Sequence, residues 1–132
     1  MMLFLSHPSL QDCRRVFLRN YEVFINIGVH EFEKKGEQRI LINVDLYVPL
    51  ADTTPTADHL DEVVDYDFIR STIAQRMARG HIHLQETLCD DVMTAMLAHP
   101  KVRAVRVSTE KPDVYPDCDS VGVETFRIKT AG

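Results

Sequence analysis

The strongest structural constraint in this sequence is a regular alternation of hydrophobic and polar residues near its middle. In the segment Gln38–Leu50, every second residue carries a branched aliphatic side chain: Ile40, Ile42, Val44, Leu46 and Val48. A β-strand has a side-chain period of two, so these residues share one face and the polar residues between them share the other. The sequence therefore predicts a strand here, with one face of its sheet against a hydrophobic core.

Weaker patterns predict the rest of the fold. Alternation recurs in three further segments: Val16–Val29, Val102–Thr109 and Val121–Ile128. Hydrophobic residues at helical spacing predict one helix between Asp65 and Gly80 and a second at Leu84–Ala98. The order strand, strand, helix, helix, strand, strand indicates an α+β fold with one four-stranded antiparallel sheet and both helices packed on one face.

Length and sheet size bound the organisation of the chain. The predicted domain covers residues 16–132, and residues 1–15 form an N-terminal extension. With 132 residues, of which 45% are hydrophobic, the chain buries a single core. A small sheet leaves long edge strands that proteins usually pair, so we expect several subunits to join edge to edge in a ring.

Composition argues against several functional classes. A formal net charge of -5 disfavours non-specific binding to nucleic acid, which requires a basic face. No segment approaches the ~20 consecutive apolar residues of a membrane span, so a soluble protein without a membrane partner is expected. The three cysteines are widely spaced and lack a C-x-x-C motif, which is typical of the reducing cytoplasm.

Four side chains with complementary chemistry lie at predicted element boundaries, where a rigid scaffold can direct them into a cleft: Glu33, Tyr66, Glu86 and Lys111. In the first turn of a helix, Glu86 is placed to accept hydrogen bonds from a ring N–H and an exocyclic amine, the donors of a guanine-like ring. A lysine held away from water, as Lys111 would be in a cleft, can act as a base. Taken singly, each residue is more often a solvated charge or a packing aromatic.

Other reactive residues support a site less well. The segment His81-Ile82-His83 has the form of a metal-binding pair, but zinc requires a third protein ligand and the remaining histidines follow no supporting pattern. Cys89 lies beside the hydrophobic stripe of the second helix, so we expect a buried, unreactive thiol. No nucleotide-binding glycine motif is present. We therefore expect neither a metal nor a cofactor.

Six short motifs, in order and at compatible spacings, resemble the dihydroneopterin aldolase family. They are Ile27-Gly28-Val29-x-x-x-Glu33, Gln38, Asp58-x-Leu60-x-x-Val63-Val64-Asp65-Tyr66, Leu84-x-Glu86, Lys111-Pro112 and Val121-Gly122-Val123. The resemblance covers about residues 16–128. It implies a T-fold with ββααββ order, and homo-tetramers or homo-octamers with active sites between subunits.

The resemblance also implies a reaction and residue roles. The substrate would be 7,8-dihydroneopterin, cleaved by a retro-aldol reaction in folate biosynthesis, with epimerase activity as a side reaction. Lys111, Tyr66 and Glu33 would be catalytic. Glu86 would bind the pterin edge, together with Gln85, Val64 and Asp65. Because the dihydropterin ring is itself an electron sink, this chemistry needs only positioning and proton transfer.

The sequence departs from the family pattern near the proposed base. Lys111 comes about two residues later after its strand than is common in the family, and Glu110 places a charge beside it. Two alternatives remain open, an epimerase acting on dihydroneopterin triphosphate and a non-catalytic pterin-binding ring, whereas a zinc-dependent pterin synthase is disfavoured. The triphosphate would require a cluster of basic side chains, and the zinc enzyme has too few ligands.

Overall fold

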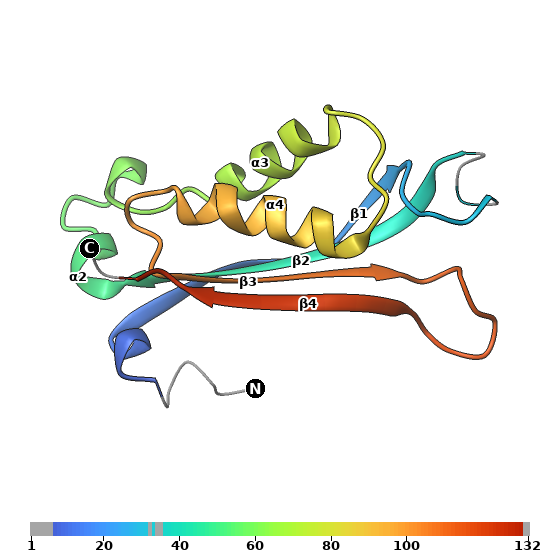
Figure 1. Cartoon of the computed structure of the whole chain (residues 1–132). Coiled ribbons are helices and arrows are strands. Elements are labelled where there is room, and N and C mark those ends of the chain that lie inside the picture. Colours follow the sequence, from blue (N-terminus) through green and yellow to red (C-terminus); the bar gives the residue numbers. More distant parts are fainter. Residues whose placement is uncertain (1–6, 32, 34–35, 131–132) are drawn as a thin grey trace.

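The computed structural model describes residues 7–31, 33 and 36–130 and confirms the α+β fold. One antiparallel sheet contains β1 (Cys13–Ile25), β2 (Gln38–Pro49), β3 (Ala104–Lys111) and β4 (Val121–Ile128), in that spatial order. Helices α3 (Asp67–Met77) and α4 (Gln85–Leu97) lie together on one face of the sheet (Figure 1). The chain thus forms two layers, with β1 and β4 as the edge strands.

Alternation in β2 produces the core as predicted. The alternating residues Ile40, Ile42, Val44, Leu46 and Val48 are fully buried and face the two helices. The helices contribute Ile69 and Ile73 from α3, and Leu88, Val92 and Met96 from α4. Short turns complete the chain: η1 (Pro8–Leu10), α2 (Leu50–Thr53) and η3 (Leu60–Glu62). No helix in the described ranges is long and apolar enough to cross a membrane.

Strand β1 begins three residues before residue 16, the predicted start of the domain. β1 starts at Cys13, and Leu10 in the preceding turn is 2% exposed, packed with Tyr47 and Ala104. A bulge interrupts β1 after Leu18, where Asn20 adopts φ 53° and its N–H donates to Oδ1 of Asn43. Residues 1–6 lie outside the described residues.

The predicted C-terminal ends of the first and third strands were wrong, and both lie at the end of the sheet that holds Glu33 and Lys111. The first strand ends at Ile25, because Ile27 pairs with Ile82 and Gly28 then turns at φ 128°. The third strand starts two residues later than predicted and continues through Lys111, which pairs with Val121. Lys111 is therefore a strand residue that shares the helix-facing side with the core valines.

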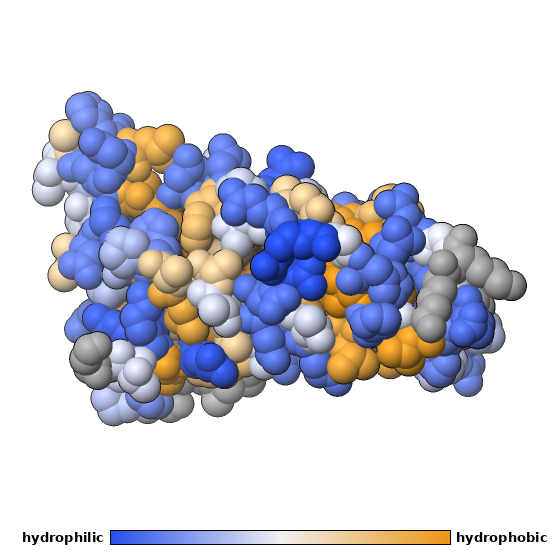
Figure 2. Space-filling view, turned by 45° about the horizontal axis from the view of Figure 1, so that its top comes forward, coloured by the Kyte–Doolittle hydropathy of each residue, from blue (hydrophilic) through white to orange (hydrophobic). Residues whose placement is uncertain are grey.

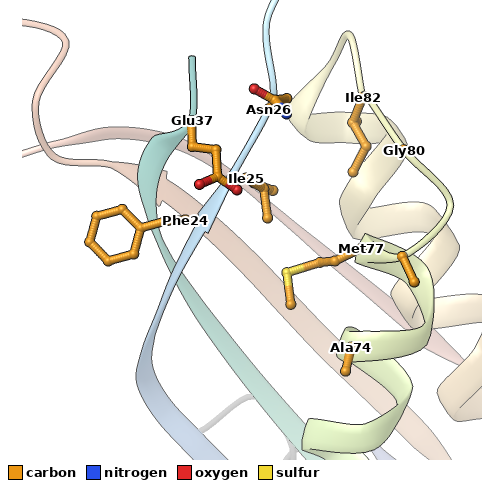
Figure 3. A pocket seen from close by; sticks show the side chains of 9 residues that line it. Phe24, Ile25, Asn26, Glu37, Ala74, Met77, Gly80 and Ile82 are labelled. Carbon is orange, nitrogen blue, oxygen red and sulfur yellow. The ribbon is translucent and has the colours of Figure 1, made fainter.

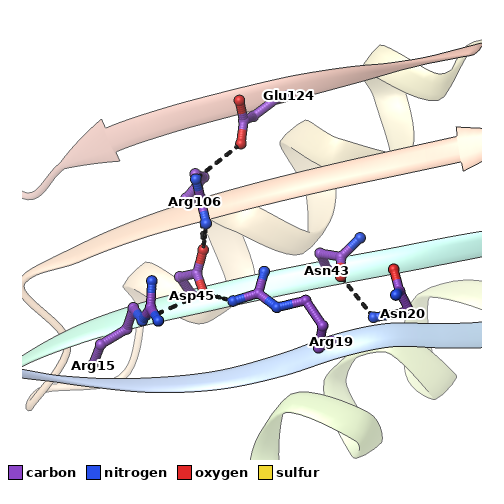
Figure 4. A network of polar contacts seen from close by, with 7 residues as sticks. All are labelled: Arg15, Arg19, Asn20, Asn43, Asp45, Arg106 and Glu124. Atoms are coloured by element: carbon purple, nitrogen blue, oxygen red, sulfur yellow. Dashed lines mark hydrogen bonds and ion pairs between the residues drawn. The ribbon is translucent and has the colours of Figure 1, made fainter. Parts of the chain in front are cut away.

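The sheet face opposite the helices carries charged residues around one buried carboxylate (Figure 4). Asp45 is 1% exposed and binds Arg106 and Arg19, the latter at 3.2 Å, while Arg15 lies 3.9 Å away. Glu124 pairs with Arg106 at 3.3 Å. This network connects β1, β2, β3 and β4 across the face without helices.

Candidate active site

A cavity of about 260 Å³ lies at the end of the sheet where β3 ends and β4 begins. Its walls come from the β1–β2 connection, the N-terminal turn of α4, the end of β3 and the β3–β4 connection. In Figure 1 both connections project from the right-hand end of the molecule, beside the start of α4. Figure 2 shows hydrophobic side chains at the surface of this end, where Val29, Leu84 and Val121 are each more than a third exposed.

The cavity brings together Glu33, Gln85, Glu86 and Lys111, four of the seven residues predicted for the site. Nζ of Lys111 lies 2.5 Å from Oε2 of Glu33. Glu33 is 3% exposed and Lys111 8%. Glu33 and Lys111 are far apart in the sequence, and the fold brings their charged groups together as a buried ion pair. Both residues line the cavity.

The carboxylate of Glu33 receives three hydrogen bonds. Besides Lys111, Nε2 of Gln38 donates to Oε2 at 3.3 Å, and the N–H of His30 donates to Oε1 at 3.3 Å. Burial by itself raises the pKa of Glu33, but the bonds from Lys111, His30 and Gln38 outweigh it and lower the pKa below its ordinary value. Glu33 is therefore ionised at neutral pH.

Gly28 makes room for this carboxylate. A Cβ at Gly28 would lie 2.3 Å from Cδ of Glu33, which no side chain tolerates. The glycine is held from the other side by Ile82, whose carbonyl accepts from its N–H at 2.9 Å, and by His81, whose Nε2 lies 3.0 Å from its carbonyl oxygen. The close approach and the positive φ both require glycine here.

The opposite wall is the start of α4. The helix follows Leu84 and opens with Gln85 and Glu86. Because leucine has no polar side chain to cap the first turn, the backbone N–H groups there are open to a ligand. Glu86 is exposed, and the partial positive charge of the helix end favours its carboxylate. This wall offers anionic acceptors beside N–H donors, as a guanine-like edge requires.

The other three predicted residues, Val64, Asp65 and Tyr66, do not line this cavity. Val64 is buried in the core, and Oδ1 of Asp65 accepts from the N–H of Asp67 where α3 begins. Phe68 packs against His99, ring centroids 5.0 Å apart, so the start of α3 lies at the C-terminal end of α4. The 13 residues of α4 separate that end from Glu86 by about 20 Å. Tyr66 is 67% exposed there.

Sequence reasoning missed the polar residues that support the site. Thr109 is fully buried on the helix-facing side of β3 and donates to Oε1 of Gln85 at 2.8 Å. If the predicted strand had continued to its true end, alternation would have placed Thr109 on the same face as Lys111.

The prediction for Cys89 is confirmed, because the thiol is 1% exposed and burial raises its pKa to about 11.

The rings of His81 and His83 lie 5.0 Å apart, and His83 lines the cavity. Within the described residues, no three histidine, cysteine or acidic side chains come together in a group suited to a metal ion.

A second pocket lies between the edge strand β1 and the end of α3, with Phe24, Met77 and Glu37 around it (Figure 3). It shares none of the predicted site residues.

The FolB dihydroneopterin aldolase family model matches residues 16–126. The chain belongs to the dihydroneopterin aldolase family. A crystal structure of dihydroneopterin aldolase from Burkholderia thailendensis bound to guanine is 66% identical, with a TM-score of 0.87 over 96% of this chain and 99% of that one. The T-fold implied by the sequence is thereby confirmed.

Two other curated proteins are less similar to this chain. Dihydroneopterin aldolase from Escherichia coli is 26% identical over 111 residues, which are 82% of this chain and 88% of that protein. Dihydroneopterin triphosphate 2'-epimerase from Pseudomonas aeruginosa is 24% identical over 109 residues, which are 83% of this chain and 88% of that protein. Both reactions are therefore represented among the relatives of this aldolase-family chain.

Proposed function

We propose that this protein cleaves 7,8-dihydroneopterin by a retro-aldol reaction to 6-hydroxymethyl-7,8-dihydropterin and glycolaldehyde, a step of folate biosynthesis. The observation that carries the proposal is the buried pair of Lys111 and Glu33, which faces Glu86 across one cavity. Membership of the dihydroneopterin aldolase family and the 66% identical, guanine-bound relative support it.

In the proposed reaction, Glu86 accepts hydrogen bonds from the pterin amine and ring N–H, and the first turn of α4 completes the edge. Lys111 acts as the free amine after giving one proton to water, and it then takes the proton of the 2'-hydroxyl while Glu33 stays ionised beside it. The C1'–C2' bond breaks, its electrons move into the C6=N5 imine, and C2' leaves as the aldehyde carbon of glycolaldehyde. Protonation at C1' then yields the hydroxymethyl product. Neither a metal nor a cofactor enters these steps.

Tyr66 enters the proposal as a residue of the neighbouring subunit. It is exposed about 20 Å from Glu86 in its own chain, estimated from the length of α4, so its own cavity is out of reach. The unpaired edges of β1 and β4 support a homo-tetrameric or homo-octameric ring in which one subunit's Val64–Tyr66 segment meets its neighbour's cavity. There Tyr66 would orient the trihydroxypropyl chain and help protonate C1', while Val64 and Asp65 contact the ring.

This two-subunit arrangement has a direct test. Lys111→Ala and Tyr66→Phe variants, each of low activity alone, are co-expressed with different tags and purified as mixed oligomers. If each site uses residues of two chains, some sites in the mixture contain both native residues, and activity rises above that of either variant. Activity no greater than the average of the two variants would place both residues in one chain's site.

Product analysis tests the proposed reaction itself. The purified protein is incubated with 7,8-dihydroneopterin in excess EDTA, and glycolaldehyde and 6-hydroxymethyl-7,8-dihydropterin are quantified. Release of both products supports a metal-independent aldolase. If no cleavage occurs either with or without EDTA, the proposed reaction is refuted.

We also place the protein in the cytoplasm, since all three cysteines are free and reduced thiols persist there.

A second candidate is epimerisation of dihydroneopterin triphosphate, the reaction named for the Pseudomonas aeruginosa relative. Among the described residues that line the cavity, Lys111 is the only lysine or arginine, and Glu33 already neutralises it. A triphosphate requires several cationic partners, so the unphosphorylated substrate fits better. Inversion at C2' of the triphosphate, without cleavage of dihydroneopterin, would reverse this preference.

A further inference from the structure

A chain of three neighbouring polar side chains, two of them buried, runs from the core to the cavity. Sγ of Cys89 on α4 has two acceptors in range, Oγ1 of Thr109 at 3.6 Å and the carbonyl oxygen of Val123 at 3.8 Å. Oγ1 of Thr109 in turn donates to Oε1 of Gln85 at 2.8 Å. Cys89 and Thr109 are 1% and 0% exposed, whereas Gln85 is half-buried and lines the cavity. The chain therefore ends on a side-chain amide at the cavity wall, next to Glu86.

The direction of these bonds determines which end of the amide is left for a ligand. Burial keeps the Cys89 thiol protonated, since its pKa lies at about 11, so at neutral pH the sulfur is a donor. The Thr109 hydroxyl is one of the two acceptors of that thiol, and its own single proton goes to Oε1 of Gln85. The carbonyl end of the amide is thus occupied, and its NH₂ group remains as a donor.

We propose that Thr109 holds the amide of Gln85 in one orientation, so that its NH₂ group reads the ring carbonyl beside the edge bound by Glu86. This inference rests on the proposed function and deepens it. A pterin or guanine edge presents a carbonyl, a ring N–H and an amine in sequence. Glu86 accepts from the two donors, and Gln85 donates to the carbonyl. Gln85 is then a specificity-determining residue, and Thr109 is a positioning residue.

The consequence is selection of a 6-oxo ring over a 6-amino ring. An amide free to turn over can present its oxygen to an amine as readily as its nitrogen to a carbonyl. The Thr109 bond makes that reversal unfavourable, because a turned amide would take the acceptor away from the buried hydroxyl proton of Thr109. Glu86 also disfavours the amino ring, which lacks the ring N–H, but its contribution does not depend on Thr109.

Isothermal titration calorimetry with guanine and 2,6-diaminopurine measures this selection. For each protein the quantity compared is the ratio of the Kd for 2,6-diaminopurine to the Kd for guanine. Thr109→Val keeps the shape of the side chain and removes the hydroxyl, so the ratio should fall about tenfold, the equivalent of one hydrogen bond. Thr109→Ser restores the hydroxyl and should restore the ratio. Thr125→Val, the same change on the helix-facing side of β4, should leave it unchanged.

Gln85→Glu provides a second variant, independent of whether Thr109→Val folds. A carboxylate at this position still accepts from Thr109 but offers no donor to the ring carbonyl, so guanine binding should weaken more than 2,6-diaminopurine binding. If neither Thr109→Val nor Gln85→Glu changes the ratio, the carbonyl is read by backbone N–H groups and the inference is wrong.

The two proposals fail in different ways. One outcome is that the wild-type protein cleaves 7,8-dihydroneopterin while the ratio of the two Kd values is the same in the Thr109 and Gln85 variants as in wild type. In that case the inference is wrong and the aldolase assignment stands. If the ratio depends on Thr109 while no cleavage occurs, the oxo-selective site stands and the proposed reaction falls.

Discussion

The substitution Gly28→Ala tests how the buried pair is built. An ideal Cβ at this position lies 2.3 Å from Cδ and 2.4 Å from Oε1 of Glu33. Packed interiors do not accommodate such an approach, so the carboxylate must move. Lys111 is 8% exposed and would then lose the oxygen that lies 2.5 Å from its Nζ. One added methyl group should therefore break an ion pair in which it takes no part.

Two costs add in this variant. A non-glycine residue at φ 128° costs ~1–3 kcal/mol. Removal of one partner from a buried ion pair costs ~3–5 kcal/mol. The free energy of unfolding, measured by urea denaturation at pH 7, should fall by about 4 kcal/mol, the sum of the two lower limits. Turnover of 7,8-dihydroneopterin should fall as well, because the acceptor beside Lys111 is displaced.

Two other glycines separate these costs. Gly80 has φ 102°, but no heavy atom lies within 4 Å of its Cβ position, so Gly80→Ala carries the backbone cost alone. Gly36, in the same connection as Gly28, is open and has no positive φ, so Gly36→Ala should be nearly neutral. If Gly28→Ala is no more destabilising than Gly80→Ala, the steric link between Gly28 and the ion pair does not exist.

Three further predictions concern the charged residues of the cavity. Lys111→Ala should abolish turnover while guanine still binds within a few-fold of wild type in calorimetry, and retained turnover would contradict its role as base. Glu86→Ala should weaken guanine binding by ~2–5 kcal/mol, the cost of an unpaired charge-assisted contact; an unchanged Kd would remove Glu86 from the ring edge. The folded pKa of Glu33 lies below its unfolded value near 4.5, so its contribution is complete above that value and is lost as the pH falls through the folded pKa. The difference in unfolding free energy between wild type and Glu33→Gln should therefore be constant near pH 7 and shrink in acid, and a difference that grew in acid would reverse the sign of the shift.

The fold was predictable because its signal is repeated along the chain. Five aliphatic residues in β2 determine its buried face, and the order of six elements leaves few arrangements for a single sheet. Boundaries were less predictable where tertiary contacts override local pattern. The first strand ends early because the backbone of Ile27 and Gly28 pairs with Ile82, a partner from between the helices. The alternation of residues around Ile27 does not predict this contact with Ile82.

The site was predictable in its residue types and less so in its geometry. Glu33 and Lys111 were expected as members of one cavity, but their direct bond depends on Gly28 and on β3 reaching Lys111. Strand continuation also answers the question of Glu110, which points to the sheet face opposite Lys111. Alternation can place Thr109 on the face of Lys111, but it cannot show that the hydroxyl has a partner, because a threonine in a strand is usually there for its β-branched shape.

The Lys111–Glu33 pair is better explained by chemistry than by stability. Burying two charges costs desolvation that their attraction repays only in part, and hydrophobic residues of similar volume are often neutral or stabilising in such places. The surrounding helix-facing residues of β3, Val105 and Val107, show that this side of the strand readily carries aliphatic side chains. If stability alone determined this position, we would expect the aliphatic pattern of Val105 and Val107 to continue to position 111. Its interruption by a charged pair at the cavity wall, where Gly28 leaves room for the carboxylate, supports the proposed role of this pair in proton transfer.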